Sequence, residues 1–121
     1  MKKILIVEDN ELNMKLVFDI LQYQKYEPIK AVDGEIAYEK IKSEKFDLII
    51  LDIQLPKLNG FELLEKLKKE NISLPPVIIA SACAMDSDKQ LAQKYGIDTY
   101  ITKPIDLNNF IKAVKSSLGE I

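Results

Sequence analysis

Residues 4–9 read ILIVED and residues 48–52 read LIILD, and these two stretches indicate how the chain is built. Each begins with four aliphatic residues and ends in acidic residues, which are Glu8 and Asp9 in the first stretch and Asp52 in the second. Unbroken aliphatic runs of this length are typical of parallel strands buried on both faces. Because ligands bind outside the carboxyl ends of such strands, the three carboxylates are expected to share one pocket. Close like charges repel, so this pocket is expected to recruit a hard divalent cation.

Each of these carboxylates, taken alone, also has a simpler structural explanation. Asp9 and Asn10 could cap a helix that follows them, and Asp52 could begin a turn. That explanation weakens when all three acids lie at strand ends, because separate caps and turns do not require such an arrangement. It weakens further if other polar residues occupy equivalent positions.

A hydroxyl and an ammonium group do follow two later apolar segments. Ser81 comes after residues 77–80 (VIIA), and Lys103 comes after residues 100–102 (YIT) and before Pro104. Magnesium-assisted phosphoryl transfer needs this set of groups, because a metal neutralises phosphate oxygens while positioned donors hold the remaining charge. A lone serine or a lone Lys-Pro pair would be uninformative. The ordered set indicates a site for phosphate chemistry.

These residues resemble a known family, the receiver domains of two-component response regulators. The matching segments are residues 6–10 (IVEDN), residues 51–56 (LDIQLP), Asn59-Gly60, Ser81-Ala82 and Lys103-Pro104. Residues 7–16 (VEDNELNMKL) are similar to single-domain regulators of the DivK type and to receivers attached to hybrid histidine kinases. The resemblance extends from Lys3 to about Leu118. It implies one receiver domain over residues 1–121 that acts as a cytoplasmic phosphorylation switch.

The resemblance also implies a role for each polar residue of the predicted pocket. Asp52 would accept a phosphoryl group from the phosphohistidine of a sensor kinase or phosphotransfer protein. Glu8 and Asp9 would bind Mg²⁺ together with Asp52. Ser81 and Lys103 would contact the phosphoryl group once it is attached.

Two further residues are predicted to complete this site and to pass on its signal. The backbone carbonyl of Gln54 is expected to be a further magnesium ligand. Tyr100 occupies the position of the family's switch aromatic, and it is expected to rotate when Ser81 moves toward the phosphate. The chain carries no effector domain, so its output is expected to be contact with a downstream protein.

The first predicted helix is expected to serve as the docking surface for the phosphodonor, as it does in receivers. Its inward stripe is predicted to be Leu12, Leu16, Val17, Ile20 and Leu21. Met14 and Phe18, four residues apart, would then fall on the outward flank. An isolated exposed aromatic residue is common, but the resemblance favours docking through these two side chains.

Alternating strand and helix signals predict five β-α units. The predicted strands cover residues 3–7, 28–32, 47–51, 77–80 and 99–102. The predicted helices cover residues 11–24, 35–43, 60–70 and 86–95, and a fifth, capped by Asp106, covers 107–118. Five such units give an α/β fold with a doubly wound parallel sheet. The resemblance implies the strand order 2-1-3-4-5.

Composition excludes several other classes of protein. A net charge of −2 without a basic cluster gives no electrostatic footprint for nucleic acid. No apolar run approaches the length of a membrane span, so no membrane contact is expected. With no histidine and one cysteine, Cys83, zinc sites and histidine acid–base catalysis are excluded. The single cysteine suits a reducing cytoplasm, and a buried, unreactive thiol is expected.

Three alternative functions fit the residues less well. A phosphatase of the haloacid-dehalogenase type needs a second aspartate two residues after its nucleophile, and that position here is Gln54. A receiver-like interaction module that never takes phosphate would usually lack one of the acids or the lysine, and all are present. A flavodoxin-like cofactor domain would need a phosphate-binding loop after its first strand. Turnover of an external substrate is therefore not expected.

Overall fold

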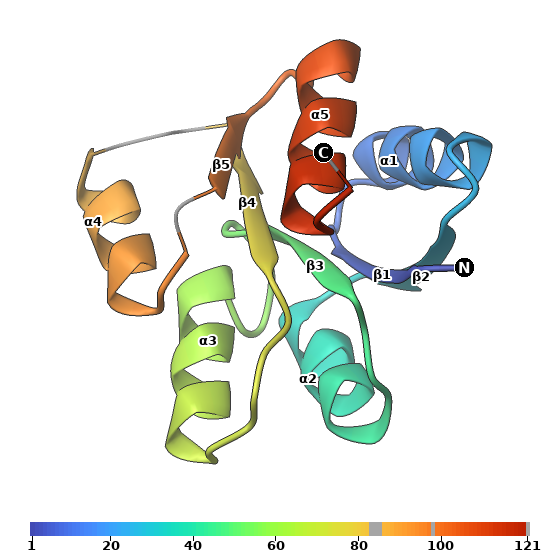
Figure 1. The fold of residues 1–121 in the computed structure, drawn as a ribbon. Coiled ribbons are helices and arrows are strands. Elements are labelled where there is room, and N and C mark those ends of the chain that lie inside the picture. The colour runs from blue at the N-terminus through green and yellow to red at the C-terminus, as the bar shows by residue number, and fades with distance from the viewer. Residues whose placement is uncertain (83–85, 98, 121) are drawn as a thin grey trace.

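Five parallel strands alternate with five helices along the chain (Figure 1). The computed structural model describes residues 1–82, 86–97 and 99–120. Its elements are β1 (Lys3–Val7), α1 (Glu11–Tyr23), β2 (Glu27–Ala31), α2 (Gly34–Ser43), β3 (Leu48–Asp52), α3 (Gly60–Lys69), β4 (Val77–Ser81), α4 (Asp86–Lys94), β5 (Thr99–Thr102) and α5 (Leu107–Ser117). The sheet order is β2-β1-β3-β4-β5, which confirms the predicted fold class and strand order.

Each element boundary lies within one residue of the predicted one. β2 begins and ends one residue earlier than predicted, and β3 one residue later. As a result Asp52 and Ser81 are the last residues of β3 and β4, paired within the sheet, rather than the first residues beyond it. Cys83, predicted to be a buried thiol, lies outside the described residues.

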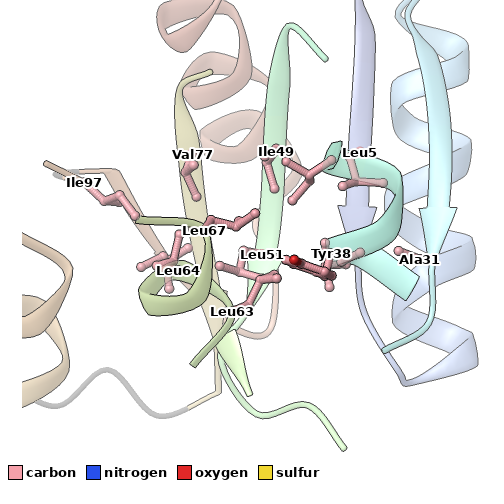
Figure 2. Close-up of a cluster of buried hydrophobic side chains, with 14 of the residues drawn as sticks. Leu5, Ala31, Tyr38, Ile49, Leu51, Leu63, Leu64, Leu67, Val77 and Ile97 are labelled. Atoms are coloured by element: carbon pink, nitrogen blue, oxygen red, sulfur yellow. The ribbon is translucent and has the colours of Figure 1, made fainter. Parts of the chain in front are cut away.

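The helices cover both faces of the sheet, with α1 and α5 on one face and α2, α3 and α4 on the other (Figure 1). Side chains alternate along each strand, so that Ile4 and Ile6 face α1 and α5 while Leu5 and Val7 face α2 and α3. Figure 2 shows the cluster on the α2 and α3 side, where Leu63, Leu64 and Leu67 pack against the sheet. These two layers hold the carboxyl ends of β1 and β3 rigidly.

Asparagine and aspartate side chains begin four of the helices at the carboxyl edge of the sheet. Asn10, Asp33, Asn59 and Asp106 each accept a hydrogen bond from the backbone N–H three residues later. These caps satisfy helix donors that would otherwise lack a partner. Because Asn10 rather than Asp9 caps α1, the carboxylate of Asp9 is left for another role.

The predicted inward stripe of α1 is confirmed at Val17, Ile20 and Leu21 but is wrong at Leu12 and Leu16. Met14, Val17 and Leu21 face the sheet, whereas Leu12 is 79% exposed and Leu16 is 45% exposed. Apolar residues occupy two overlapping stripes of this helix, so periodicity alone did not distinguish them. The side chain of Met14 is only 5% exposed and belongs to the core, and therefore it does not stand on an outward flank.

Candidate functional site

Three carboxylates converge at the carboxyl edge of the sheet. Glu8 and Asp9 follow β1, and Asp52 ends the neighbouring strand β3. One carboxylate oxygen from each residue lies within 4.8 Å of the others. Glu8 and Asp52 are buried and Asp9 is exposed. The cluster is thus buried at Glu8 and Asp52 and open to solvent at Asp9.

An ammonium group links the two buried carboxylates. Lys103 follows β5, and its Nζ donates hydrogen bonds to Glu8 Oε1 at 2.5 Å and to Asp52 Oδ2 at 2.9 Å. The backbone N–H of Lys103 donates to the carbonyl of Ser81 at 2.8 Å, which fixes the start of the following loop to β4. The side chain of Lys103 is 11% exposed, so these ion pairs are largely shielded from water.

Backbone donors fix the remaining oxygens of the two buried carboxylates. The N–H of Asn10 donates to Glu8 Oε2 at 3.2 Å, and the N–H of Gln54 donates to Asp52 Oδ1 at 3.0 Å. Each buried carboxylate is therefore held by Lys103 through one oxygen and by the chain through the other. This arrangement orients both side chains.

The pocket carries an excess of negative charge. Burial raises the pKa of Glu8, and the hydrogen bond from Lys103 offsets this only in part. Burial by itself lowers the pKa of Lys103, but hydrogen bonds to Glu8 and Asp52 outweigh it and leave that pKa raised. Three carboxylates and one ammonium leave about two negative charges, which a divalent cation with oxygen ligands would neutralise. The donor set fits Mg²⁺.

The structure also places Ser81 beside the acidic cluster. Ser81 is the last residue of β4, is 1% exposed, and pairs with Thr102 across the sheet. Asp52 pairs with Ala80, so Ser81 lies one position beyond Asp52 at the same edge. Ser81 ends β4 and Lys103 follows the neighbouring strand β5, so both lie on the side of β3 opposite β1.

Tyr100 lies away from the cluster, on the side of β5 that faces α4. It pairs with Ile79 in β4 and packs against the hydrophobic cluster of the α2 and α3 face. A surface cavity of about 290 Å³ lies between Tyr100 and α4, lined by Lys89, Ala92, Gln93 and Ile97. Tyr100 is therefore separated from the acids, although it belongs to the strand that Lys103 follows.

The two predicted docking residues, Met14 and Phe18, line a surface groove beside the acidic cluster, although neither side chain is exposed. The groove has a volume of about 520 Å³ and extends from Glu8 and Asp9 past Met14 and Phe18. Phe18 is half-buried, and Lys30 Nζ lies 4.6 Å from the centre of its ring. The exposed large hydrophobic residues of α1 are instead Leu12, Leu16 and Tyr23, of which Leu12 and Leu16 were predicted to face inward.

One residue near the cluster escaped the sequence analysis. Gly34, which begins α2, closely approaches Leu58 in the loop of residues 53–59. This loop includes Gln54, whose carbonyl remains a predicted ligand. An Asp-Gly pair before a helix does not reveal which distant segment packs against the glycine.

The sequence matches a family model described as the response regulator receiver domain over residues 4–115. Two similar curated proteins are polar-differentiation response regulators DivK. That of Brucella anthropi is 41% identical and that of Brucella ovis 42% identical, each over 120 residues that cover 98% of both chains. The match spans all of the strands and helices described above.

Solved structures of receiver domains share the fold. A CheY-like receiver domain protein from Methanospirillum hungatei is 32% identical with a TM-score of 0.90, and the match covers 99% of this chain and 95% of that one. The receiver domain of a sensor histidine kinase from Pseudomonas aeruginosa is 26% identical with a TM-score of 0.86, over 98% of both chains. That domain has a magnesium ion coordinated in its active site cleft. On the match along its length, its strand order and its acidic edge, this chain belongs to the receiver domain family of two-component response regulators.

Proposed function

We propose that the chain is a phosphorylation switch in which Asp52 accepts a phosphoryl group from a phosphohistidine. The observation that carries the proposal is the setting of Asp52, a buried carboxylate at the end of β3 held by Lys103 and the Gln54 N–H beside two further acids. In the transfer, the bond between phosphorus and the histidine nitrogen breaks as a bond to an Asp52 oxygen forms. The histidine nitrogen keeps the electron pair of the broken bond.

Glu8, Asp9 and Asp52 would hold Mg²⁺, with the backbone carbonyl of Gln54 as a further ligand. When bound, the ion supplies the charge neutralisation that phosphoryl transfer needs. Lys103 supplies a second positive charge next to Asp52 and holds that side chain in place before the donor arrives. The exposed side of the cluster at Asp9 is the face that a donor can approach.

The attached phosphate would signal through Ser81 and Tyr100. A phosphoryl group brings roughly −1.5 to −2 charges and strong hydrogen-bond acceptors to the edge where Ser81 and Lys103 lie. Ser81 donates to a phosphate oxygen, and Tyr100 then repacks against α4, changing the surface formed by α4, β5 and α5. We propose that this surface contacts a downstream protein in the cytoplasm. None of the helices among the described residues has the length and apolarity to cross a membrane.

Acetyl phosphate provides the test of this function. The protein incubated with acetyl phosphate and Mg²⁺ should gain the mass of one phosphate, which acid or hydroxylamine removes according to the chemistry of an acyl phosphate. A receiver-like interaction module would gain no mass under these conditions. A phosphatase would instead hydrolyse added phosphate esters catalytically.

Substitution Asp9→Asn is expected to weaken Mg²⁺ binding strongly and to slow phosphorylation by acetyl phosphate. The reason is that Asp9 is the solvent-facing carboxylate of the cluster, and an amide oxygen carries no full charge to offset the cation. Without Mg²⁺ the variant should be slightly more stable, because one repelling carboxylate is gone. Thermal unfolding with and without Mg²⁺ measures both effects. A metal-induced shift equal to that of the wild type would contradict the assignment of Asp9.

Four exposed apolar side chains surround the acidic edge and form a docking surface for a protein donor. Leu12 and Ile36 lie in the first turns of α1 and α2, Val32 follows β2, and Leu107 begins α5. All four therefore stand where strands end and helices begin, which is also the edge that carries Asp52. We propose that a histidine kinase or phosphotransfer protein covers this surface during transfer.

Substitution Leu12→Ala is expected to slow transfer from a phosphorylated protein donor roughly tenfold, since burying a leucine is worth about 1.5–3 kcal/mol. The rate with acetyl phosphate should not change, because a small donor needs no docking surface. Tyr23→Ala is the matched control, since Tyr23 is 81% exposed but lies at the far end of α1. Equal loss with both donors, or equal loss in both variants, would place the docking surface elsewhere.

A further inference from the structure

Gly34 leaves no room for a side chain against the loop that connects β3 to α3. A Cβ atom added to Gly34 would lie 2.8 Å from the Cβ of Leu58 and 2.9 Å from its carbonyl carbon, and it would overlap the Leu58 carbonyl oxygen. The obstacle is backbone, so rotation of a flexible side chain cannot relieve it. The start of α2 and the loop of residues 53–59 therefore approach each other too closely for any side chain at position 34.

Hydrogen bonds within the loop connect the region of Leu58 to the backbone that contacts Asp52. The N–H of Leu58 donates to the carbonyl of Pro56 at 2.7 Å, and the N–H groups of Leu55 and Gly60 both donate to the carbonyl of Ile53, at 3.1 and 2.8 Å. Residue 54, which follows this doubly bonded carbonyl, donates its own N–H to Asp52. The position of Leu58 and the position of the Gln54 backbone are therefore set within one hydrogen-bonded loop.

A second contact joins the same two segments. The side chain of Asp33 accepts a hydrogen bond from the N–H of Ile36 at 2.8 Å as the cap of α2, and its other oxygen lies 3.6 Å from Lys57 Nζ. Lys57 adopts the left-handed backbone conformation with φ of +66°, which costs energy for a residue with a side chain. The loop is thus held in a tight shape directly beside α2.

We infer that Gly34 is a positioning residue for the magnesium site. Because it has no side chain, the loop of residues 53–59 can lie where the Gln54 N–H donates to Asp52 and the Gln54 carbonyl can bind the cation. The inference rests on the proposed function of the acidic cluster as a magnesium site. It concerns a residue that contacts neither the cation nor the phosphate. Residues that only orient ligands can change metal affinity by about 10–100-fold.

The test is the Mg²⁺ affinity of the variant Gly34→Ala, measured by following backbone amide resonances during titration with MgCl₂. Alanine suits the first turn of a helix better than glycine does, so a loss cannot come from helix propensity. We expect the affinity to fall at least about tenfold, with shifted resonances at Gln54 and Leu55 before any metal is added. The wild-type protein, titrated in parallel, reports whether the site binds Mg²⁺ at all, independently of phosphorylation.

Gly119→Ala is the matched control, because Gly119 has φ of +74° and an added Cβ would meet nothing within 4 Å. This variant should lose stability through backbone strain and keep its Mg²⁺ affinity. An affinity of folded Gly34→Ala equal to that of the wild type would overturn the inference. If the wild type binds Mg²⁺ but takes no phosphate, the proposed function fails and the inference about Gly34 can still hold.

If Gly34→Ala does not fold, the Mg²⁺ affinity of the variant Lys57→Gln tests the inference instead. Removal of the positive charge of Lys57 would by itself strengthen Mg²⁺ binding. Loss of the contact between Lys57 and Asp33 would instead loosen the loop and so weaken Mg²⁺ binding. Weaker binding in Lys57→Gln supports the positioning of the loop by α2. Equal or tighter binding overturns it.

Discussion

Replacing Asp52 with asparagine is expected to abolish the uptake of phosphate from acetyl phosphate. Asparagine keeps the shape of the side chain but offers a neutral amide in place of the nucleophilic oxygen, and loss of a nucleophile commonly costs three orders of magnitude in rate or more. The buried setting of Asp52 should survive, because Lys103 can still donate to Glu8. Intact mass after incubation with acetyl phosphate and Mg²⁺ measures the result.

Asp47→Asn provides the control for Asp52→Asn. Asp47 directly precedes β3, accepts a hydrogen bond from the N–H of Lys3 at 2.7 Å, and therefore lies at the opposite edge of the sheet. This variant should acquire phosphate as the wild type does. Uptake at the wild-type rate by Asp52→Asn would show that another residue is the acceptor, and loss of uptake in Asp47→Asn would show that charge removal in general impairs the protein.

Replacing Lys103 with methionine is expected to destabilise the metal-free protein by about 3–5 kcal/mol, the usual cost of breaking a buried ion pair from one side. Glu8 and Asp52 would then face each other in a buried pocket without their shared ammonium. Mg²⁺ should recover more stability in this variant than in the wild type, because a cation replaces the missing charge. Chemical denaturation with and without Mg²⁺ gives both free energies of unfolding.

Acidification should also recover part of the stability of Lys103→Met. Burial already raises the pKa of Glu8, and loss of Lys103 removes the hydrogen bond that opposes this rise. A carboxyl group whose pKa is higher in the folded state than in the unfolded state destabilises the fold above its unfolded pKa. The deficit of the variant should therefore shrink as the pH falls toward the range in which Glu8 is protonated.

Lys15→Met is the control for Lys103→Met. Lys15 also donates to a carboxylate, that of Asp19 at 2.8 Å, but both side chains are more than half exposed. Such surface pairs contribute about 0–1 kcal/mol. A similar loss of stability in both variants would mean that the burial of the Lys103 ion pairs has no energetic consequence.

The sequence predicted those features that depend on local chemistry. Unbroken aliphatic runs identified the central strands, and polar residues after them identified Glu8, Asp9, Asp52 and Lys103 as neighbours. These predictions succeed because parallel strands must be apolar on both faces, and their carboxyl ends must then meet at one edge. A short segment of sequence is enough to recognise such a strand and its end.

Features that depend on contacts between distant segments could not be predicted in this way. The inward stripe of α1 was misjudged at Leu12 and Leu16 because these residues are as apolar as Met14, and only packing against Ile4 and Ile6 separates the two stripes. The space that Gly34 leaves for Leu58 joins residues that are 24 positions apart. No local pattern records either contact.

Lys103 spans most of the sheet, since its backbone follows the edge strand β5 while its ammonium reaches Glu8 beyond β1, with β4 and β3 in between. One side chain therefore ties the first strand of the chain to the last. Tyr100 lies three residues before Lys103, within β5, and faces α4. Residues 100–103 therefore form one short segment that contacts the acidic cluster at its Lys103 end and lines the cavity beside α4 at its Tyr100 end.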